Sequence, residues 1–450
     1  MMQMNKDYKV TAVALGCAQN RIDTEEILAL LGRCGYLITD DPREADLIIV
    51  NTCAFIEAAQ QESIETILKL AGERRDKKTP LIVAGCLAQR YGSRLLQALP
   101  EIDGVIGVHS YAEMVRFVER TLAGKRESLL LAPARRYRGL GARLLIAAPH
   151  SVYVKIAEGC SNRCRYCLIP SLRGPLRSRP PDEIVDEIRE LISRGAREIN
   201  IVAQESTAYG LDLGIRGGLP KLLQKILREI GANFWLRILY ANPARVDGDL
   251  IDLIARENRI CKYLDLPLQH INDAVLKRMG RRYTGAVVND LLQKLRRRIP
   301  QIVLRTTFMV GFPGESRAHY RELSSFLREQ PIERVGVFSY SRQPGTAAAR
   351  FSQQVPPRVK EKRRRDLLRI QQGPALAFNR TLVGKTFIVL VEGSVGQSGS
   401  LYRGRTSFQA PEVDGTLFFR SRRPLKAGDW TAVRITAVSP YDLYGTALAY

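Results

Sequence analysis

Apolar, strand-like runs alternate with amphipathic, helix-like stretches along two successive parts of this 450-residue chain. In the first part the strand-like runs are KVTAVAL, DLIIVN, LIVAG and GVIGV, with stretches such as DTEEILALLGRCG between them. This order is typical of a mostly parallel sheet with helices on its faces. We therefore expect an N-terminal α/β domain over residues 7–124.

A basic stretch that contains glycines, PARRYRGLGARLL, follows, and we interpret residues 125–145 as a linker. The alternation then resumes over residues 146–378, with strand-like runs VYVKIA, EINIVAQ, FWLRILY, YLDLPLQ, VLRTTFMVG and RVGVFSY. Six strand–helix units are fewer than the eight of a full barrel. The sequence therefore predicts a partial (β/α)6 barrel.

The last part of the chain has a different pattern. A basic helix, PPRVKEKRRRDLLRIQQ, leads to short strand-like runs separated by turns: KTFIVLVEG, LYRGRTSF, GTLFFRS, WTAVRITAVS and YGTALAY. This pattern indicates a small antiparallel β-barrel over residues 379–450, of a kind that often contacts nucleic acid or protein.

Composition limits the setting in which such a chain works. No apolar run approaches the roughly 20 residues that cross a bilayer, and the N-terminal MMQMNKDYKV lacks the apolar segment of a signal peptide. We expect a cytoplasmic protein with no membrane contact, in which eight cysteines favour metal ligation over disulfides. The net charge of +23 favours an RNA-rich environment, although solubility alone is the other interpretation.

Three cysteines follow the first barrel strand with the spacing C-x3-C-x2-C: Cys160, Cys164 and Cys167. A structural zinc ion needs four ligands, and none of the four histidines lies at finger-like spacing. Three thiolates instead suit a 4Fe-4S cluster whose fourth iron has no protein ligand. The open iron is then available to the amine and carboxylate of S-adenosylmethionine.

A second set of three cysteines lies in the N-terminal domain, each directly after a strand-like run: Cys17, Cys53 and Cys86. The carboxyl ends of parallel strands meet at one edge of a sheet, so we expect these side chains to converge. A second three-thiolate cluster is the preferred interpretation, and three buried structural cysteines are the alternative. Cys34 and Cys261 lack this context and are expected in the core.

With its C-x3-C-x2-C signature, the chain resembles the radical S-adenosylmethionine superfamily, in which the aromatic residue before the last cysteine, here Tyr166, lies beside the cofactor's adenine. Its three parts, spanning residues 8–450, resemble the methylthiotransferase family, whose terminal module is a TRAM domain. The resemblance implies two 4Fe-4S clusters and S-adenosylmethionine. It implies that the barrel cluster makes a 5′-deoxyadenosyl radical and that the N-terminal cluster supplies sulfur. An external electron donor and a sulfur source are also implied.

Four segments resemble the branch of this family that modifies a ribosomal protein: CLIPSLRGPLRSRP, AQESTAYGLDL, APEVDG and YDLYG. The implied reaction is methylthiolation of the β-carbon of an aspartate in the twelfth protein of the small ribosomal subunit. The alternative is methylthiolation of adenosine in transfer RNA. From Arg380 onward the sequence has nine Lys or Arg and five Asp or Glu, so the last module is basic and favours RNA contact. A ribosomal-protein substrate and a basic last module are compatible if the enzyme meets its substrate on a ribosomal particle.

Further residues are expected near the barrel mouth. We predict cofactor contacts for Gln204 after the second strand, Arg237 on the third and Gln269 after DLPL; each has a turn or capping role as its alternative. Gly311 and Glu315 of VGFPGE are placed there too. For the basic cluster Arg173, Arg177 and Arg179 the two interpretations are a solvated loop and contact with a carboxylate of substrate or cofactor. No catalytic side chain is assigned.

Overall fold

The computed structural model describes residues 8–74, 79–396 and 399–448, so the first seven residues of the chain lie outside it. The chain forms two compact units. One comprises Met1–Ala147, Ala157–Asn162 and Cys167–Arg179, and the other comprises the remaining segments. Within the described ranges no helix is both long enough and apolar enough to span a bilayer.

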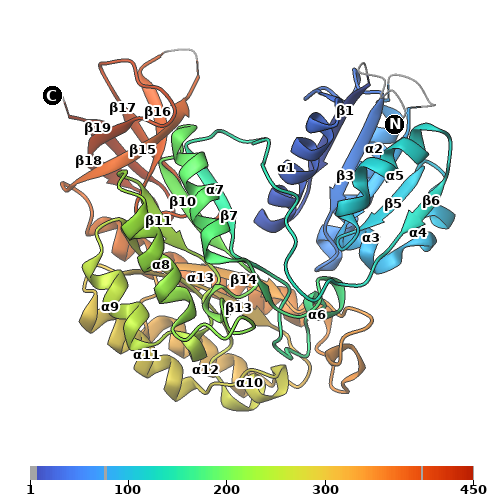
Figure 1. Cartoon of the computed structure of the whole chain (residues 1–450). Helices are drawn as coiled ribbons and strands as arrows, with labels where there is room; N and C mark the ends of the chain where they lie inside the picture. Colours follow the sequence, from blue (N-terminus) through green and yellow to red (C-terminus); the bar gives the residue numbers. More distant parts are fainter. Residues whose placement is uncertain (1–7, 75–78, 397–398, 449–450) are drawn as a thin grey trace. The chain divides into compact units, whose positions relative to one another are not determined.

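The first unit is built on a six-stranded sheet with the order β2-β1-β3-β4-β5-β6, in which every pair is parallel. Apolar side chains of alternate strand positions form a core on each face, one under α1 and α5 and the other under α2, α3 and α4 (Figure 1). The strands are β1 (Lys9–Ala14), β2 (Leu37–Ile38), β3 (Leu47–Thr52), β4 (Leu81–Gly85), β5 (Gly104–Gly107) and β6 (Glu127–Leu129). The helices are α1 (Ala18–Arg33), α2 (Glu57–Gly72), α3 (Cys86–Tyr91), α4 (Ser93–Ala98) and α5 (Met114–Leu122).

The segment expected as a linker packs against this unit. The Arg143 guanidinium forms an ion pair with Glu25 of α1 at 2.8 Å, and both side chains are 3% exposed. Two pieces of the cysteine-bearing loop also belong here, joined by the two-stranded pairing of β8 (Ala157–Glu158) with β9 (Arg177–Ser178). The short helix α6 (Ile169–Leu172) lies between them.

The second unit contains a six-stranded parallel sheet with the order β14-β13-β12-β11-β10-β7, which confirms the expected six-strand arrangement. Helices between the strands cover its outer face (Figure 1). The strands are β7 (Ser151–Lys155), β10 (Glu198–Val202), β11 (Trp235–Ile238), β12 (Ile260–Gln269), β13 (Val303–Val310) and β14 (Arg334–Ser339). The helices are α7 (Pro181–Ser193), α8 (Gly218–Glu229), α9 (Gly248–Arg256), α10 (Asp273–Met279), α11 (Gly285–Arg298) and α12 (Arg317–Glu329).

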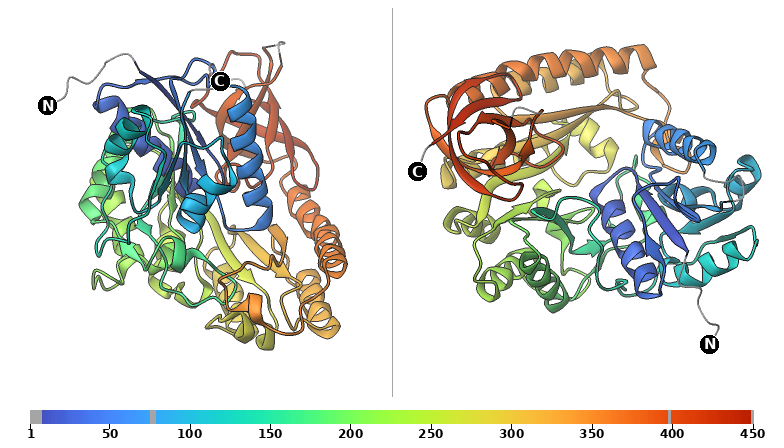
Figure 2. Two further views of the ribbon diagram at one scale, coloured as in Figure 1. Left: turned by 90° about the vertical axis from the view of Figure 1, so that its right-hand side faces the viewer. Right: turned by 90° about the horizontal axis from the view of Figure 1, so that it is seen from above.

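A long basic helix, α13 (Pro357–Arg380), leads from this sheet to a closed five-stranded barrel, seen at the C-terminal end of the chain in Figure 2. Its strands are β15 (Thr386–Ser394), β16 (Leu401–Thr406), β17 (Leu417–Arg420), β18 (Trp430–Val438) and β19 (Leu443–Ala447). The barrel closes through one parallel pair, β17 with β19, and is therefore not antiparallel throughout as expected.

The C-terminal barrel packs against the amino ends of the central strands. Glu198, the first residue of β10, accepts hydrogen bonds from Arg405 of β16 at 2.6 Å and from Arg237 of β11 at 2.7 Å. Trp235 at the start of β11 contacts Trp430 of β18, with ring centroids 4.4 Å apart. The carboxyl ends of the strands, where barrel enzymes place their chemistry, lie at the other end of the sheet.

Candidate functional site

Three cysteines of the first unit occupy the carboxyl ends of adjacent strands. Cys17 precedes α1, Cys53 follows β3, and Cys86 is the first residue of α3 directly after β4. Gly16 has a positive φ of 87°, and a Cβ placed on it would lie 2.6 Å from the Cβ of Cys53. Only glycine lets the Cys17 loop approach Cys53 this closely. The structure therefore brings these loops together at one edge, as the sequence predicted.

The three thiols differ in exposure. Cys17 is exposed, whereas Cys53 and Cys86 are buried. Burial, together with the neighbouring Cys17 and Cys86, raises the pKa of Cys53 to about 12. Burial also raises the pKa of Cys86. Without a bound cation these thiols are protonated, and it is metal ligation that deprotonates a coordinating thiol.

The donor set suits a polynuclear cluster. No group of three His, Cys, Asp or Glu side chains among the described residues is arranged around a single metal ion. A cluster places several irons between its thiolates, so its ligands lie farther apart than those of one ion. Gln19, two residues after Cys17, is buried, and neither atom of its amide has a hydrogen-bond partner in the described part of the chain. Such an unsatisfied polar group is typical of a site that holds a further component.

A buried arginine lies beside these cysteines. The Arg173 side chain, 1% exposed, donates hydrogen bonds to Asn20 Oδ1 at 2.6 Å, to Asp23 at 2.9 Å and to Glu158 at 2.7 Å. Its positive charge lowers the pKa of Cys86 and so opposes the effect of burial on that thiol. Arg173 thus provides positive charge where thiolates of a cluster would concentrate negative charge.

The structure excludes the solvated-loop interpretation of the arginine cluster, and contact with a carboxylate of substrate or cofactor stays a prediction. Arg173, Arg177 and Arg179 are all buried rather than solvated. Arg177 donates to the carbonyl oxygens of Arg173 at 2.9 Å and of Ala134 at 3.3 Å, and Arg179 lies over the ring of Tyr137. These arginines are buried because the segment that follows the cysteine loop packs within the first unit.

The other three cysteines lie on one loop, between β8 and α6, and each is partly exposed. Each sulfur accepts a hydrogen bond: Cys160 from the Asn162 amide at 3.4 Å, Cys167 from the Ile169 backbone N–H at 3.4 Å, and Cys164 from the Arg281 guanidinium at 3.5 Å. Donors of this kind stabilise thiolates and tune a ligated cluster. Sequence inspection missed Arg281, because nothing in its surroundings marks it as a neighbour of a residue 117 positions earlier.

Tyr166 packs against a loop at the carboxyl end of β13. Its ring contacts Phe312 edge to face, with centroids 6.3 Å apart. Phe312 belongs to the VGFPGE turn, in which Glu315 accepts from the Gly311 N–H at 2.7 Å and from Arg363 of α13 at 2.6 Å. Glu315 therefore stabilises the VGFPGE turn, and Phe312 of this turn packs against Tyr166.

Besides Tyr166, three residues are predicted to contact the cofactor, and two of these lie at the barrel mouth. Gln204 follows the end of β10 by two positions, and Gln269 is the last residue of β12, with a φ of 67°. Arg237 does not lie there. It is the third of the four residues of β11 and is fully buried, and its guanidinium donates to Glu198 and to the Ser407 carbonyl oxygen at 2.9 Å, so the side chain is directed toward the C-terminal barrel. The expected position of Arg237 at the mouth is wrong.

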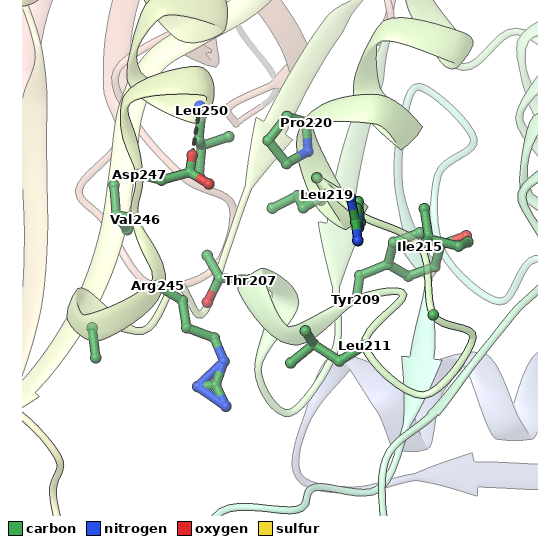
Figure 3. Close-up of a pocket in the computed structure, with 15 residues that line it drawn as sticks. Thr207, Tyr209, Leu211, Ile215, Leu219, Pro220, Arg245, Val246, Asp247 and Leu250 are labelled. Carbon is green, nitrogen blue, oxygen red and sulfur yellow. Dashed lines mark hydrogen bonds between the residues drawn. The ribbon is translucent and has the colours of Figure 1, made fainter.

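A pocket of about 540 Å³ opens among the loops that follow β10 and β11 (Figure 3). Arg245 and Val246 line one side, and Tyr209, Ile215 and Leu219 line the other. Arg245 forms an ion pair at 3.3 Å with Glu205, the residue after Gln204. The pocket is therefore mainly apolar, is lined by two arginines, Arg216 and Arg245, and lies on the same side of the sheet as Gln204.

Three protein-family models match successive parts of the chain. Residues 9–107 match "Uncharacterized protein family UPF0004", residues 154–327 match the radical SAM superfamily, and residues 383–448 match the TRAM domain. Their order agrees with the two sheets and the closed barrel.

Curated relatives resemble the chain over nearly its whole length. "Ribosomal protein uS12 methylthiotransferase RimO" of Desulforudis audaxviator is 45% identical over 99% of both chains. The protein of the same name from Pelotomaculum thermopropionicum is 44% identical over 97% of this chain and 98% of its own.

Solved structures share the fold at low identity. The radical S-adenosylmethionine methyltransferase TsrM from Kitasatospora setae, with cobalamin and a [4Fe-4S] cluster bound, gives a TM-score of 0.55 at 16% identity and covers 77% of each chain. A second structure of TsrM, with tryptophan and a cofactor analogue, gives 0.57 at 15% identity over 87% of this chain and 79% of that one.

Proposed function

Because the chain belongs to the family of ribosomal protein uS12 methylthiotransferases, we propose that its six strand-end and loop cysteines hold the two clusters of a radical S-adenosylmethionine methylthiotransferase. The enzyme modifies ribosomal protein uS12, and the acceptor is the β-carbon of an aspartate. Similarity over the full length of the RimO relatives is the observation that carries this assignment. The unactivated C–H bond of that carbon resists acid–base chemistry, which explains why a radical enzyme is needed.

When bound, a 4Fe-4S cluster with one open iron supplies reductive cleavage of S-adenosylmethionine in the barrel and a sulfur-carrying site in the N-terminal domain. Cys17, Cys53 and Cys86 ligate the N-terminal cluster. The burial of two of these thiols excludes water from that side of the site, and Arg173 offsets their charge.

In the barrel, Cys160, Cys164 and Cys167 are the ligands. The donors on their sulfurs, from Asn162, Ile169 and Arg281, hold the loop in its ligating conformation. Tyr166 lies against the cofactor's adenine, and Gln204 and Gln269 contact the cofactor from the mouth. We do not assign Arg237 to the cofactor, because its donors are occupied at the opposite end of the strands.

The partners follow from the same chemistry. The TRAM domain contacts RNA, and uS12 is met on a ribosomal particle in the cytoplasm. An external donor supplies electrons, and a separate source renews the sulfur. The exposed cations of the TRAM domain support RNA contact: Arg403, Arg420, Arg422, Arg423, Lys426 and Arg434.

Mass spectrometry of small-subunit proteins and of transfer RNA, from cells with and without this gene, tests the proposal. We expect one methylthio group on the uS12 aspartate only when the gene is present, with transfer RNA unchanged. A matched strain carrying Cys160→Ala, Cys164→Ala and Cys167→Ala should resemble the deletion. Loss of methylthioadenosine from transfer RNA, with uS12 unaltered, would refute the assignment and favour the transfer-RNA branch.

A further inference from the structure

A second cavity, of about 290 Å³, lies between the amino ends of the central strands and the closed C-terminal barrel. It is formed by β13, β14 and α13 on one side and by the loop before β17 and Tyr441 on the other. Its volume is at the lower end of the range of roughly 300–1,000 Å³ for small-molecule sites. The residues that line it are Arg305, Arg334, Val335, Gly336, Gln371, Val413, Asp414, Gly415 and Tyr441.

Arg334 is a buried cation that has no carboxylate partner in the described part of the chain. It is 4% exposed and begins β14. Its Nη2 donates to Asn379 Oδ1 at 3.1 Å, and its guanidinium lies over the ring of Phe378. Neither Nε nor Nη1 has a hydrogen-bond partner among the described residues. Leaving a buried charge uncompensated costs several kcal/mol, so this arrangement points to an anion.

The neighbouring charges do not neutralise Arg334. Asp414 accepts from the Tyr263 hydroxyl at 2.7 Å and from a backbone N–H at 2.8 Å, and it lies 3.9 Å from Arg305. Arg305 is also paired with Asp265 at 2.9 Å. The carboxylates of Asp414 and Asp265 are therefore already paired with Arg305 and with other hydrogen-bond donors. They do not compensate the positive charge of Arg334.

Gln371 adds an acceptor to the same cavity. Its Nε2 donates to the Glu333 carbonyl oxygen at 3.1 Å, whereas its Oε1 has no partner in the part of the chain that the structure describes. Arg334 and Gln371 both line the cavity, and among the described residues they leave the Nε and Nη1 donors and the Oε1 acceptor without partners. Free phosphate at neutral pH presents several acceptor oxygens and at least one P–OH donor, which matches this set. The phosphodiester of an RNA backbone presents acceptor oxygens alone, which match the guanidinium.

We propose that this cavity binds a phosphate group through Arg334 and Gln371. The site is separate from the barrel mouth and goes beyond the proposed function. A free phosphate would engage both residues, whereas a phosphate of an RNA backbone would engage Arg334 alone. The net charge of +23 and the exposed cations of the adjoining barrel favour phosphate over a carboxylate, because they raise the local concentration of phosphate-bearing polyanions.

Thermal unfolding of the full chain, followed by fluorescence of Trp235 and Trp430 at the same junction, tests the site with inorganic phosphate. At a concentration tenfold above its dissociation constant, phosphate should raise the Tm of the wild type by about 2 °C relative to chloride of equal ionic strength. Arg334→Met should abolish the rise. In chloride alone this variant should melt no lower than the wild type, because it removes an uncompensated buried charge.

A single-stranded RNA oligonucleotide distinguishes the two sources. If RNA supplies the phosphate, Arg334→Met should weaken oligonucleotide binding and reduce the slope of log K against log salt by about 0.7 to 0.9. If free phosphate is the ligand, only the Tm response to inorganic phosphate should depend on Arg334. The control Arg298→Met removes an exposed arginine paired with Asp252 and should alter neither measurement. If both probes ignore Arg334→Met, or if this variant melts well below the wild type in chloride, the proposal is wrong.

Discussion

Replacing Glu198 with glutamine tests what holds the C-terminal barrel against the central sheet. Glu198 is fully buried and accepts hydrogen bonds from Arg237 and Arg405 and from the Ser151 hydroxyl at 2.7 Å. Glutamine has nearly the same shape but no charge. The substitution therefore leaves two buried guanidiniums without their shared carboxylate.

The expected loss of stability can be worked from the pKa of Glu198. Burial by itself raises this pKa, but Arg405 and Arg237 outweigh it and lower the value from 4.5 to about 2. At about 1.4 kcal/mol per pH unit between the two values, the pairing stabilises the folded state by about 3 kcal/mol at pH 7. Breaking a buried pair typically costs about 3–5 kcal/mol, so Glu198→Gln should fall in that range.

The pH dependence has a definite sign. Because the folded-state pKa is depressed, the contribution is fully present above pH 4.5 and is lost as the pH falls toward 2. The difference between wild type and Glu198→Gln should therefore shrink by about 1.5 kcal/mol between pH 7 and pH 3.5.

Urea unfolding followed by tryptophan fluorescence measures this junction directly, because the two tryptophans of the chain pack against each other there. The matched control is Glu190→Gln on α7, an exposed carboxylate 3.5 Å from Arg194, which should cost less than about 0.5 kcal/mol. Equal losses in the two variants, or a loss from Glu198→Gln that is the same at both pH values, would refute the reasoning.

Three further predictions concern the two clusters. Reconstituted protein should bind about eight irons, and replacing Cys160, Cys164 and Cys167 with alanine should remove about half, as measured by iron analysis and EPR; zinc in place of iron would contradict this. Replacing Cys17, Cys53 and Cys86 with alanine should preserve 5′-deoxyadenosine formation but abolish sulfur transfer, with circular dichroism to exclude unfolding; lost cleavage in a folded variant would argue against separate roles. In Arg173→Met the midpoint potential of the N-terminal cluster should become more negative, because a nearby positive charge favours the reduced state. Arg173→Lys keeps the charge and should have a potential close to that of the wild type. If redox-titrated EPR finds the same potential in Arg173→Met as in the wild type, the role of Arg173 is structural alone.

The positions of the cysteines could be predicted from the sequence because each follows a recognisable strand. A residue after a parallel strand lies at the carboxyl edge whatever the details of packing, and Cys17, Cys53 and Cys86 obey this rule. The second six-stranded sheet and four strands of the first follow from the same alternation. The edge strands β2 and β6 were not predicted, because β2 has only two residues and β6 lies in the stretch expected as a linker. The parallel closure of β17 with β19 could not be predicted, because the apolar pattern of a strand does not indicate which other strand it pairs with.

Rules of this kind do not predict the positions of residues whose roles depend on contacts with distant parts of the chain. Arg237 was expected at the barrel mouth because it lies on a barrel strand, yet its guanidinium is directed to Glu198 at the amino end of β10. Arg173 has the charge of a solvated loop residue, but its partners Asn20 and Asp23 lie 153 and 150 positions away. Only the folded chain shows that this arginine is buried.

The position of the TRAM domain in the second unit bears on the conflict between a basic module and a protein substrate. The domain packs on the amino ends of the strands through Glu198, Arg405 and Trp430, whereas Gln204 and Gln269 lie at the carboxyl ends. A strand rises about 3.3 Å per residue, so the ten residues of β12 span roughly 30 Å. Screening at physiological ionic strength has a length of about 8 Å, and the charge of the TRAM domain is therefore weak at the mouth. Under the proposed function, attraction of RNA by the TRAM domain and recognition of uS12 at the mouth would act on different surfaces and so would not oppose each other.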